Sequence, residues 1–151
     1  MSDETPRPRS DGALASWPEE MDGATTHVYK RVGDVELRLF LFAPPGHTAS
    51  ARRPAIVFFF GGGWKNGSPA QFGPHCRHLA ERGMMAATAQ YRVRDRHATA
   101  PDCCVADGRS AVRWLRSHAA ELGIDPDRLG AGGGSAGGHV ALSTVTIDTI
   151  N

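Results

Sequence analysis

The stretch LGAGGGSAGG, residues 129–138, decides the fold, because a short apolar run leads directly into a serine framed by glycines. Gly133 to Gly137 read G-x-S-x-G, the pattern of a sharp turn from a strand into a helix that lifts the serine off the end of a sheet. The residues two before and two after the serine must be tiny, because their backbones nearly touch. The pattern therefore predicts that Ser135 is an exposed nucleophile and that Ala136 begins a helix.

The same glycines permit two other interpretations, a plain glycine-rich turn and a phosphate loop. Gly132 to Gly137 also fit G-x-G-x-x-G. A dinucleotide site, however, places that turn after the first strand of a βαβ unit, with an acidic residue about 20 residues further on. Here the turn comes late in the chain, which favours the nucleophile over the nucleotide site.

A second glycine motif supports the nucleophile. Residues 56–60 form an apolar run without alternation, as expected for a parallel strand covered on both faces, and FGGGW at 60–64 overlaps its end. Consecutive glycines expose backbone N–H groups, so we expect Gly62 and Gly63, together with the N–H of Ala136, to form an oxyanion hole. Trp64 is expected to line the substrate pocket, with core packing as the alternative.

The remaining sequence alternates strands with helices. A hairpin is expected through Gly33-Asp34, and Gly123 is expected to end a long helix. This alternation predicts an α/β fold with a doubly wound, mostly parallel sheet. The expected strands are residues 27–32, 35–42, 56–60, 84–90 and 129–132, and the expected helices lie within 71–82, over 102–122 and after Ser135.

With these motifs in place, the chain resembles the α/β-hydrolase superfamily, and within it the esterase/lipase group that carries an HGGGW-type oxyanion motif. The resemblance runs from about residue 35 to residue 145. Phe60 and Gly134 depart from the pattern, because a histidine usually precedes the glycines and a larger residue usually precedes the serine. The stretches that carry the resemblance are FGGGW at 60–64, Tyr91-Arg92, AVRWLRSHAAELGIDPDR at 111–128 and GGGSAGGHVAL at 132–142.

The resemblance implies a three-layer α/β/α sandwich, an α/β-hydrolase fold truncated at its C-terminus. It also implies hydrolysis of small carboxylic esters by Ser135, with no cofactor and no metal. A non-catalytic hydrolase-like binding module and a peptidase of the same superfamily are the alternatives.

The base and the orienting acid of such a site follow the serine in the chain. After Ser135 the sequence contains one histidine, His139, and one acidic residue, Asp148. His139 lies one helical turn on and is expected to pack on the helix surface, while Asp148 is too close to come from the next strand. We therefore expect the acid and base to lie beyond residue 151, and this chain alone to be nearly inactive.

The other polar candidates are expected to have ordinary structural roles. His97 follows a strand and could line the site, but a simple loop position is preferred. His75 and His78 share a helix face with too few further ligands for a metal site. The residues expected to cap helices or form turns are Asp102, Asp107, Asp125 and Asp127.

Composition limits the partners. The 17 Lys and Arg residues nearly balance the 16 Asp and Glu residues, so neither a nucleic acid nor a membrane is an expected partner. Residues 1–24 are expected to be a disordered lead-in to a hydrolase region spanning 25–151. Three cysteines, two of them adjacent, do not make a disulfide framework, which favours a reduced, cytoplasmic setting. The oligomeric state is not predicted.

Overall fold

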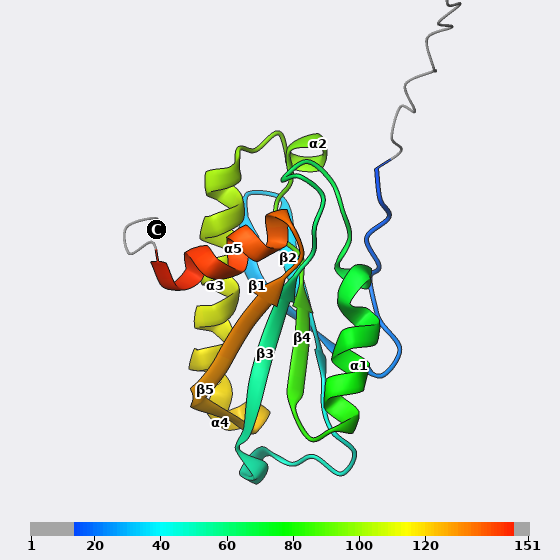
Figure 1. Cartoon of the computed structure of the whole chain (residues 1–151), viewed down its shortest axis with the longest axis vertical. Coiled ribbons are helices and arrows are strands. Elements are labelled where there is room, and N and C mark those ends of the chain that lie inside the picture. Colours follow the sequence, from blue (N-terminus) through cyan, green and yellow to red (C-terminus); the bar gives the residue numbers. More distant parts are fainter. Residues whose placement is uncertain (1–13, 147–151) are drawn as a thin grey trace, which may run out of the picture.

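A five-stranded sheet forms the centre of the computed structural model, which describes residues 14–146 (Figure 1). The strands are β1 (Ala24–Val32), β2 (Val35–Phe42), β3 (Arg53–Phe59), β4 (Met85–Ala89) and β5 (Ile124–Gly133), in the order β1-β2-β4-β3-β5. β2 is antiparallel to β1 and β4, whereas β3 is parallel to β4 and β5. Within this sheet, therefore, only β2 runs against the other strands.

Helices cover both faces of the sheet. The helices are α1 (Gly73–Glu81), α2 (Arg94–His97), α3 (Pro101–Ser117), α4 (Ala119–Leu122) and α5 (Ala136–Thr146), with 3-10 turns η1 (Ala49–Ala51) and η2 (Pro69–Phe72). α1 packs on one face, and α3 and α5 lie together on the other (Figure 1). This arrangement confirms the predicted α/β sandwich.

Alternation along the strands decides which layer each side chain enters. Val57 and Phe59 of β3 belong to the large core cluster that also contains Leu115 of α3 and Val140 of α5. Phe58, between them, packs with the smaller cluster that contains residues of α1. β3 is therefore covered on both faces, as its continuous apolar sequence predicted.

Several element boundaries differ from the expectation, and two of the differences are large. The helix expected over residues 102–122 is interrupted at His118, whose ring stacks on Trp114 at 4.1 Å and whose Nδ1 lies 2.8 Å from the Trp114 carbonyl. β5 begins at Ile124 rather than at residue 129, because Ile124 already pairs with Arg53 of β3.

Asp107 has a different role from the cap or turn that was expected. Its side chain is fully buried in the middle of α3, and it accepts hydrogen bonds from Lys30 Nζ at 2.8 Å and from the Arg92 guanidinium at 2.9 Å. The backbone N–H of Arg92 donates to the same carboxylate. The expectation was wrong because these partners come from β1 and from the loop after β4, which sequence spacing does not bring together.

The segment before β1 contacts the domain. The Trp17 indole N–H donates to the Gly67 carbonyl at 2.8 Å, and its ring meets Phe60 edge-on at 6.0 Å. The Arg96 guanidinium lies 4.6 Å from the Trp17 ring centroid. The described part of the expected disordered lead-in is therefore held against the domain, whereas residues 1–13 lie outside the described residues.

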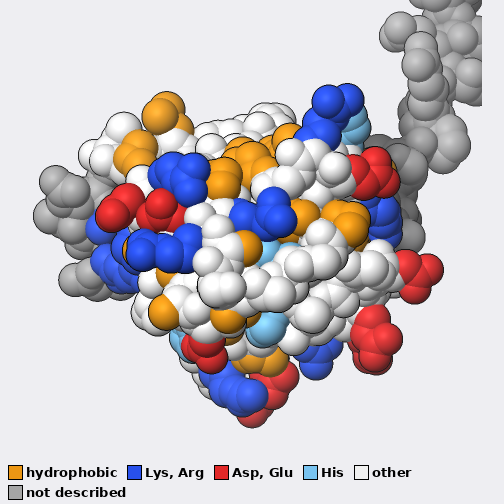
Figure 2. All heavy atoms as spheres, turned by 90° about the horizontal axis from the view of Figure 1, so that it is seen from below, with side chains coloured by type: hydrophobic (Ala, Val, Ile, Leu, Met, Phe, Trp, Pro, Cys, Tyr) orange, Lys and Arg blue, Asp and Glu red, His pale blue; other side chains and the backbone are white. Residues whose placement is uncertain are grey.

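Charges of both signs share the end of the molecule that carries η1 and α4. Figure 2 shows this end, where Lys and Arg are interspersed with Asp and Glu. Asp125 accepts a hydrogen bond from Arg128 Nε at 3.0 Å and another from the N–H of Asp127, which is the turn-forming role expected for it.

None of the helices within residues 14–146 is long and apolar enough to cross a membrane.

Candidate active site

Ser135 sits on a strained turn between β5 and α5. β5 ends at Gly133 and α5 begins at Ala136, so Gly134 and Ser135 alone make the connection. The φ angle of Ser135 is +52°, in the left-handed region that residues other than glycine rarely adopt. The serine side chain is exposed. The turn thus presents a hydroxyl at the carboxyl end of the sheet, as the G-x-S-x-G pattern predicted.

The flanking glycines allow backbones to touch. A Cβ on Gly137 would lie 1.9 Å from the Phe59 carbonyl oxygen, and one on Gly133 would lie 2.4 Å from the Gly137 carbonyl carbon. Both neighbours are main-chain atoms that no side-chain rotation can move. The start of α5 is therefore pressed against the ends of β3 and β5, which fixes the direction in which Ser135 projects.

The glycine loop after β3 lies directly against this turn. A Cβ on Gly61 would be 2.8 Å from the Gly134 oxygen and 3.5 Å from the Ser135 Cβ. The Gly61 N–H donates to Gln71 Oε1 at 2.8 Å. Within residues 14–146, the N–H groups of Gly62, Gly63 and Ala136 have no hydrogen-bond acceptor. Three free main-chain donors thus lie on two segments that meet beside Ser135.

Phe60 braces the glycine loop through its ring and its backbone. The ring stacks on Tyr91 at 4.2 Å, and the Tyr91 hydroxyl donates to the Phe60 carbonyl. Burial raises the pKa of Tyr91, so the hydroxyl keeps the proton that it donates. A phenylalanine where the resemblance expects histidine therefore still anchors the loop, by packing rather than by a polar side chain.

Gln71 and Tyr91 were not among the predicted site residues. Each makes one hydrogen bond to the backbone around Gly61, across 10 residues for Gln71 and 31 residues for Tyr91. In the sequence, Tyr91 stands out only as part of the Tyr91-Arg92 pair. No local sequence pattern marks Gln71, because its partner is a main-chain group in another loop.

Trp64 and His139 contact each other. The Trp64 indole N–H donates to His139 Nδ1 at 3.3 Å, and the two rings are nearly perpendicular, with centroids 5.4 Å apart. His139 therefore makes the packing contact expected of it. Within the described residues, no hydrogen-bond partner is found for the Ser135 hydroxyl, and Asp148 lies outside them.

His97 contacts Val93 and Trp17. Its Nδ1 accepts a hydrogen bond from the Val93 N–H at 3.0 Å, and its ring lies 5.2 Å from Trp17. Burial, together with the charge of Arg96, lowers the pKa of His97. His97 is the last residue of α2 and not a loop residue, so the position expected for it was wrong. Among residues 14–146, no three His, Cys, Asp or Glu side chains are grouped to hold a metal ion.

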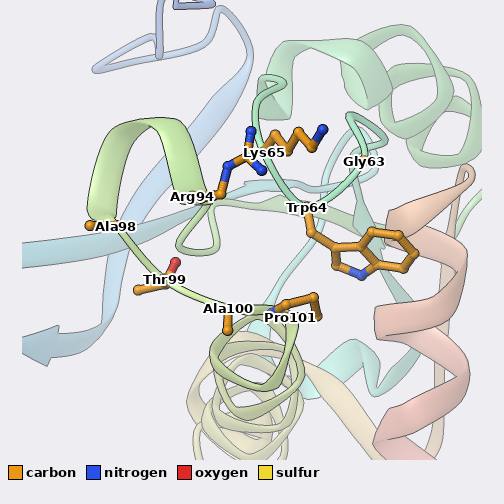
Figure 3. A pocket seen from close by; sticks show the side chains of 8 residues that line it. All are labelled: Gly63, Trp64, Lys65, Arg94, Ala98, Thr99, Ala100 and Pro101. Carbon is orange, nitrogen blue, oxygen red and sulfur yellow. The ribbon is translucent and has the colours of Figure 1, made fainter.

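A pocket of about 520 Å³ opens beside the glycine loop. Figure 3 shows its walls, which come from the loop after β3 and from α2 with the segment that follows it. Trp64 lines this pocket, although its indole turns toward α5 (Figure 3). The lining residues are Gly63, Trp64, Lys65, Arg94, Ala98, Thr99, Ala100 and Pro101.

Comparisons with known proteins find a family model and carboxylesterase relatives. Residues 39–149 match the BD-FAE family model. Among curated proteins, the chain is 35% identical over 104 residues to the probable carboxylic ester hydrolase LipM and 31% identical over 114 residues to carboxylesterase NlhH, both of Mycobacterium tuberculosis. It covers 24% and 34% of those two proteins, respectively, and 68% and 75% of its own length is matched.

A solved esterase is more similar. The native Est2 structure, from the planctomycete Thermogutta terrifontis, is 55% identical, with a TM-score of 0.82. The match covers 86% of this chain and 46% of that esterase. Other structures of the same esterase have butyrate bound or are phosphorylated by paraoxon. The chain therefore spans less than half of this solved relative and about a quarter to a third of the two curated ones.

Proposed function

The chain belongs to the BD-FAE family of α/β-hydrolases, and on this basis we propose that it carries the nucleophile and oxyanion hole of a serine hydrolase for carboxylic esters. The observation that supports the proposal is the close approach of Gly61 to Gly134 and Ser135, since a Cβ added to Gly61 would lie 2.8 Å from the Gly134 oxygen. The esterase names of the relatives support the same reaction class.

In the proposed reaction, the Ser135 oxygen attacks the acyl carbonyl carbon while a base removes the hydroxyl proton. The carbonyl oxygen becomes an oxyanion, and the N–H groups of Gly62, Gly63 and Ala136 donate to it. When the tetrahedral intermediate collapses, the ester C–O bond breaks and the alcohol leaves with the proton from the base. Water then releases the acyl group from Ser135 by the same steps.

The base and its orienting acid are proposed to come from sequence that this chain does not include. The Ser135 hydroxyl has no partner within residues 14–146, and His139 is engaged by Trp64. The longer relatives contain sequence that this chain does not match. Alone, the chain is therefore expected to be nearly inactive, since loss of the base costs about 10⁴ to 10⁶ in kcat.

A chimera tests this proposal. Residues 14–146 would replace the matching part of the Thermogutta terrifontis esterase, and hydrolysis of p-nitrophenyl acetate would be measured for the chimera and for this chain alone. We expect turnover by the chimera that Ser135→Ala reduces by about 10⁴-fold or more. Ser117→Ala, at the exposed far end of α3, is the matched control and should leave the rate unchanged.

Two outcomes would count against the proposal. Robust hydrolysis by the chain alone that disappears in Ser135→Ala would show that the base lies within this chain. A folded chimera that binds esters without Ser135-dependent turnover would favour the non-catalytic binding module. The absence of a hydrogen-bond partner for the Ser135 hydroxyl within residues 14–146 is also compatible with that module. Faster cleavage of a p-nitroanilide than of the ester would favour the peptidase.

A further inference from the structure

Two side chains hold the first peptide unit of the glycine loop from opposite sides. The Tyr91 hydroxyl donates to the Phe60 carbonyl, and Gln71 Oε1 accepts the Gly61 N–H at 2.8 Å. In a trans peptide, the carbonyl of one residue and the N–H of the next point in opposite directions. Both polar groups of this peptide are therefore bound, and it cannot rotate unless one of the two hydrogen bonds breaks.

The peptide that carries the Gly63 N–H is held at its carbonyl. The N–H groups of Lys65 and Asn66 both donate to the Gly62 carbonyl at 3.1 Å. The Gly63 N–H, on the other side of the same peptide, therefore points away from those two donors. The Gly62 N–H belongs to the peptide between the two held ones, so its direction depends on both of them, and the bond to the Gly61 N–H fixes one.

The turn that presents Gln71 is itself well anchored. Gln71 lies in η2, where the Thr88 hydroxyl of β4 donates to the Pro69 carbonyl through a buried hydrogen bond of 2.7 Å. The next residue, Phe72, is buried, and its ring stacks on that of Phe58 with centroids 4.9 Å apart. The side-chain amide of Gln71 therefore reaches the glycine loop from a fixed backbone.

The same amide lies beside the nucleophile turn. A Cβ on Gly134 would lie 3.9 Å from Gln71 Nε2 and 3.6 Å from the Phe72 ring. The Gly61 N–H can be accepted by the amide oxygen and not by its nitrogen, so this bond fixes which way the amide faces. Gln71 thus binds the loop that carries two of the proposed oxyanion donors and borders the turn that carries Ser135.

We propose that Gln71 is a positioning residue for the proposed ester hydrolysis. By holding the Gly61 N–H, it keeps the next two N–H groups of the loop, those of Gly62 and Gly63, aimed at the oxyanion. This role rests on the proposed function and names a side chain on which its oxyanion hole depends. Donors held in advance act mainly in the transition state, so loosening them should lower kcat and leave KM nearly unchanged.

Hydrogen exchange in the full chain tests the positioning without requiring turnover. Amide exchange rates and chemical shifts of ¹⁵N-labelled protein would be compared for the wild type, Gln71→Met and Gln71→Glu. Methionine has a similar length but only a weak acceptor, whereas glutamate keeps an oxygen at the same reach. We expect the Gly61 amide to exchange at least tenfold faster in Gln71→Met and at nearly the wild-type rate in Gln71→Glu. Gln71 is exposed, so the urea midpoint should stay close to that of the wild type.

Kinetics of the chimera that carries residues 14–146 test the consequence for the reaction. Gln71→Met is expected to lower kcat for p-nitrophenyl acetate by about 10- to 100-fold, less than removal of a donor, because the donors remain and are only misplaced. A trifluoromethyl ketone, whose adduct with Ser135 places an oxyanion in the hole, should bind more weakly by the same factor. Glu81→Met, at the exposed end of α1, is the matched control and should change neither kcat nor KM.

The proposal is overturned if Gln71→Met leaves Gly61 exchange unchanged, or if kcat and the affinity for the ketone stay within about twofold of the wild type. A lower kcat accompanied by a lower urea midpoint and unchanged affinity for the ketone would show a merely structural role. Failure of the proposal is separable from failure of the esterase function. Ser135-dependent turnover that ignores Gln71→Met would reject only the role of Gln71. Faster Gly61 exchange beside an inactive chimera would reject the reaction instead.

Discussion

At the scale of single residues, the site depends on main-chain contacts that only glycine permits. Ser135 pays a conformational cost of roughly 1–2 kcal/mol for its left-handed backbone. The turn nevertheless holds, because Gly133 and Gly137 let α5 press on the ends of β3 and β5. The strained backbone of Ser135 is therefore held in place by the close packing of α5. A side chain at Gly133 or Gly137 would disturb both the packing and the turn.

Gly137→Ala should be strongly destabilising. The added Cβ would lie 1.9 Å from the Phe59 oxygen and 2.4 Å from the Phe60 oxygen, so α5 would have to move away from β3. We expect a loss of about 3 kcal/mol in the free energy of unfolding, the upper end for overpacking. Urea denaturation followed by circular dichroism measures it. Gly130→Ala, whose Cβ would meet nothing closer than 3.9 Å, is the control, and equal midpoints for the two variants would contradict the prediction.

Removing the charge of Asp107 should also destabilise the fold. In Asp107→Asn, Lys30 and Arg92 keep their charges without the buried carboxylate that both contact. Breaking a buried ion pair on one side costs about 3–5 kcal/mol, and we expect the low end because the Lys30 side chain is 21% exposed. Glu36→Gln, at an exposed pair with Arg31, should cost less than about 1 kcal/mol in the same urea assay. A comparable loss in both variants would show that burial of Asp107 is not decisive.

At the scale of elements, the short helix α2 links the pocket to the rest of the fold. His97 ends α2, and its ring accepts the Val93 N–H only while Nδ1 is unprotonated. Burial lowers the pKa of His97 below its ordinary value of 6.5. The folded state therefore binds this proton less readily than the unfolded state does. The stabilisation is present above the unfolded pKa and is lost as the pH falls toward the folded one.

The stability of the chain should accordingly decrease between pH 7.5 and pH 5.5, and His97→Gln should reduce that decrease. Urea midpoints at the two pH values measure the effect, and an NMR titration of the His97 ring gives its pKa directly. His27, whose pKa is also lowered by burial, contributes in the same direction, so some pH dependence should remain in the variant. A pH response unchanged by His97→Gln, or a ring pKa above 6.5, would contradict the prediction.

The elements that the sequence predicts well are those with a local signal. A few neighbouring residues are enough to predict that β3 is buried on both faces, because its apolar run does not alternate. The glycines around Ser135 likewise predict the turn there. The break at His118 is not visible in the sequence, because the apolar spacing continues through it. Asp107 and Gln71 are missed for a related reason, since their partners are brought to them by the sheet.

At the scale of the whole molecule, the sheet places both glycine motifs at one end. β3 and β5 are parallel neighbours, so the loops that follow them emerge side by side, where parallel sheets bind ligands. Sequence reasoning predicts this placement because it follows from strand direction alone. It does not predict how Trp64 turns toward His139, or that Lys65 and Arg94 share a pocket, because these depend on loop conformations.

The other consequence of the sheet order is an open edge. β5 pairs with β3 on one side, and no strand among residues 14–146 pairs with its other side. Beside it, Leu142 and Val145 of α5 are 63% and 76% exposed, and a groove of about 380 Å³ runs between the two elements. Unpaired strand edges and exposed apolar patches both promote association.

We therefore expect this chain to self-associate as its concentration rises, and Leu142→Lys to reduce that association by placing a charge beside the open edge. Sedimentation velocity over a range of concentrations measures both. The substitution should not affect folding, because Leu142 is largely outside the core. Leu14→Lys provides the control, since Leu14 is also exposed, at 47%, but lies outside the β5–α5 groove. Equal dissociation of both variants would show that general surface hydrophobicity, rather than the β5 edge, drives association. A chain that stays monomeric at every concentration would contradict the prediction and show that the β5 edge does not promote association.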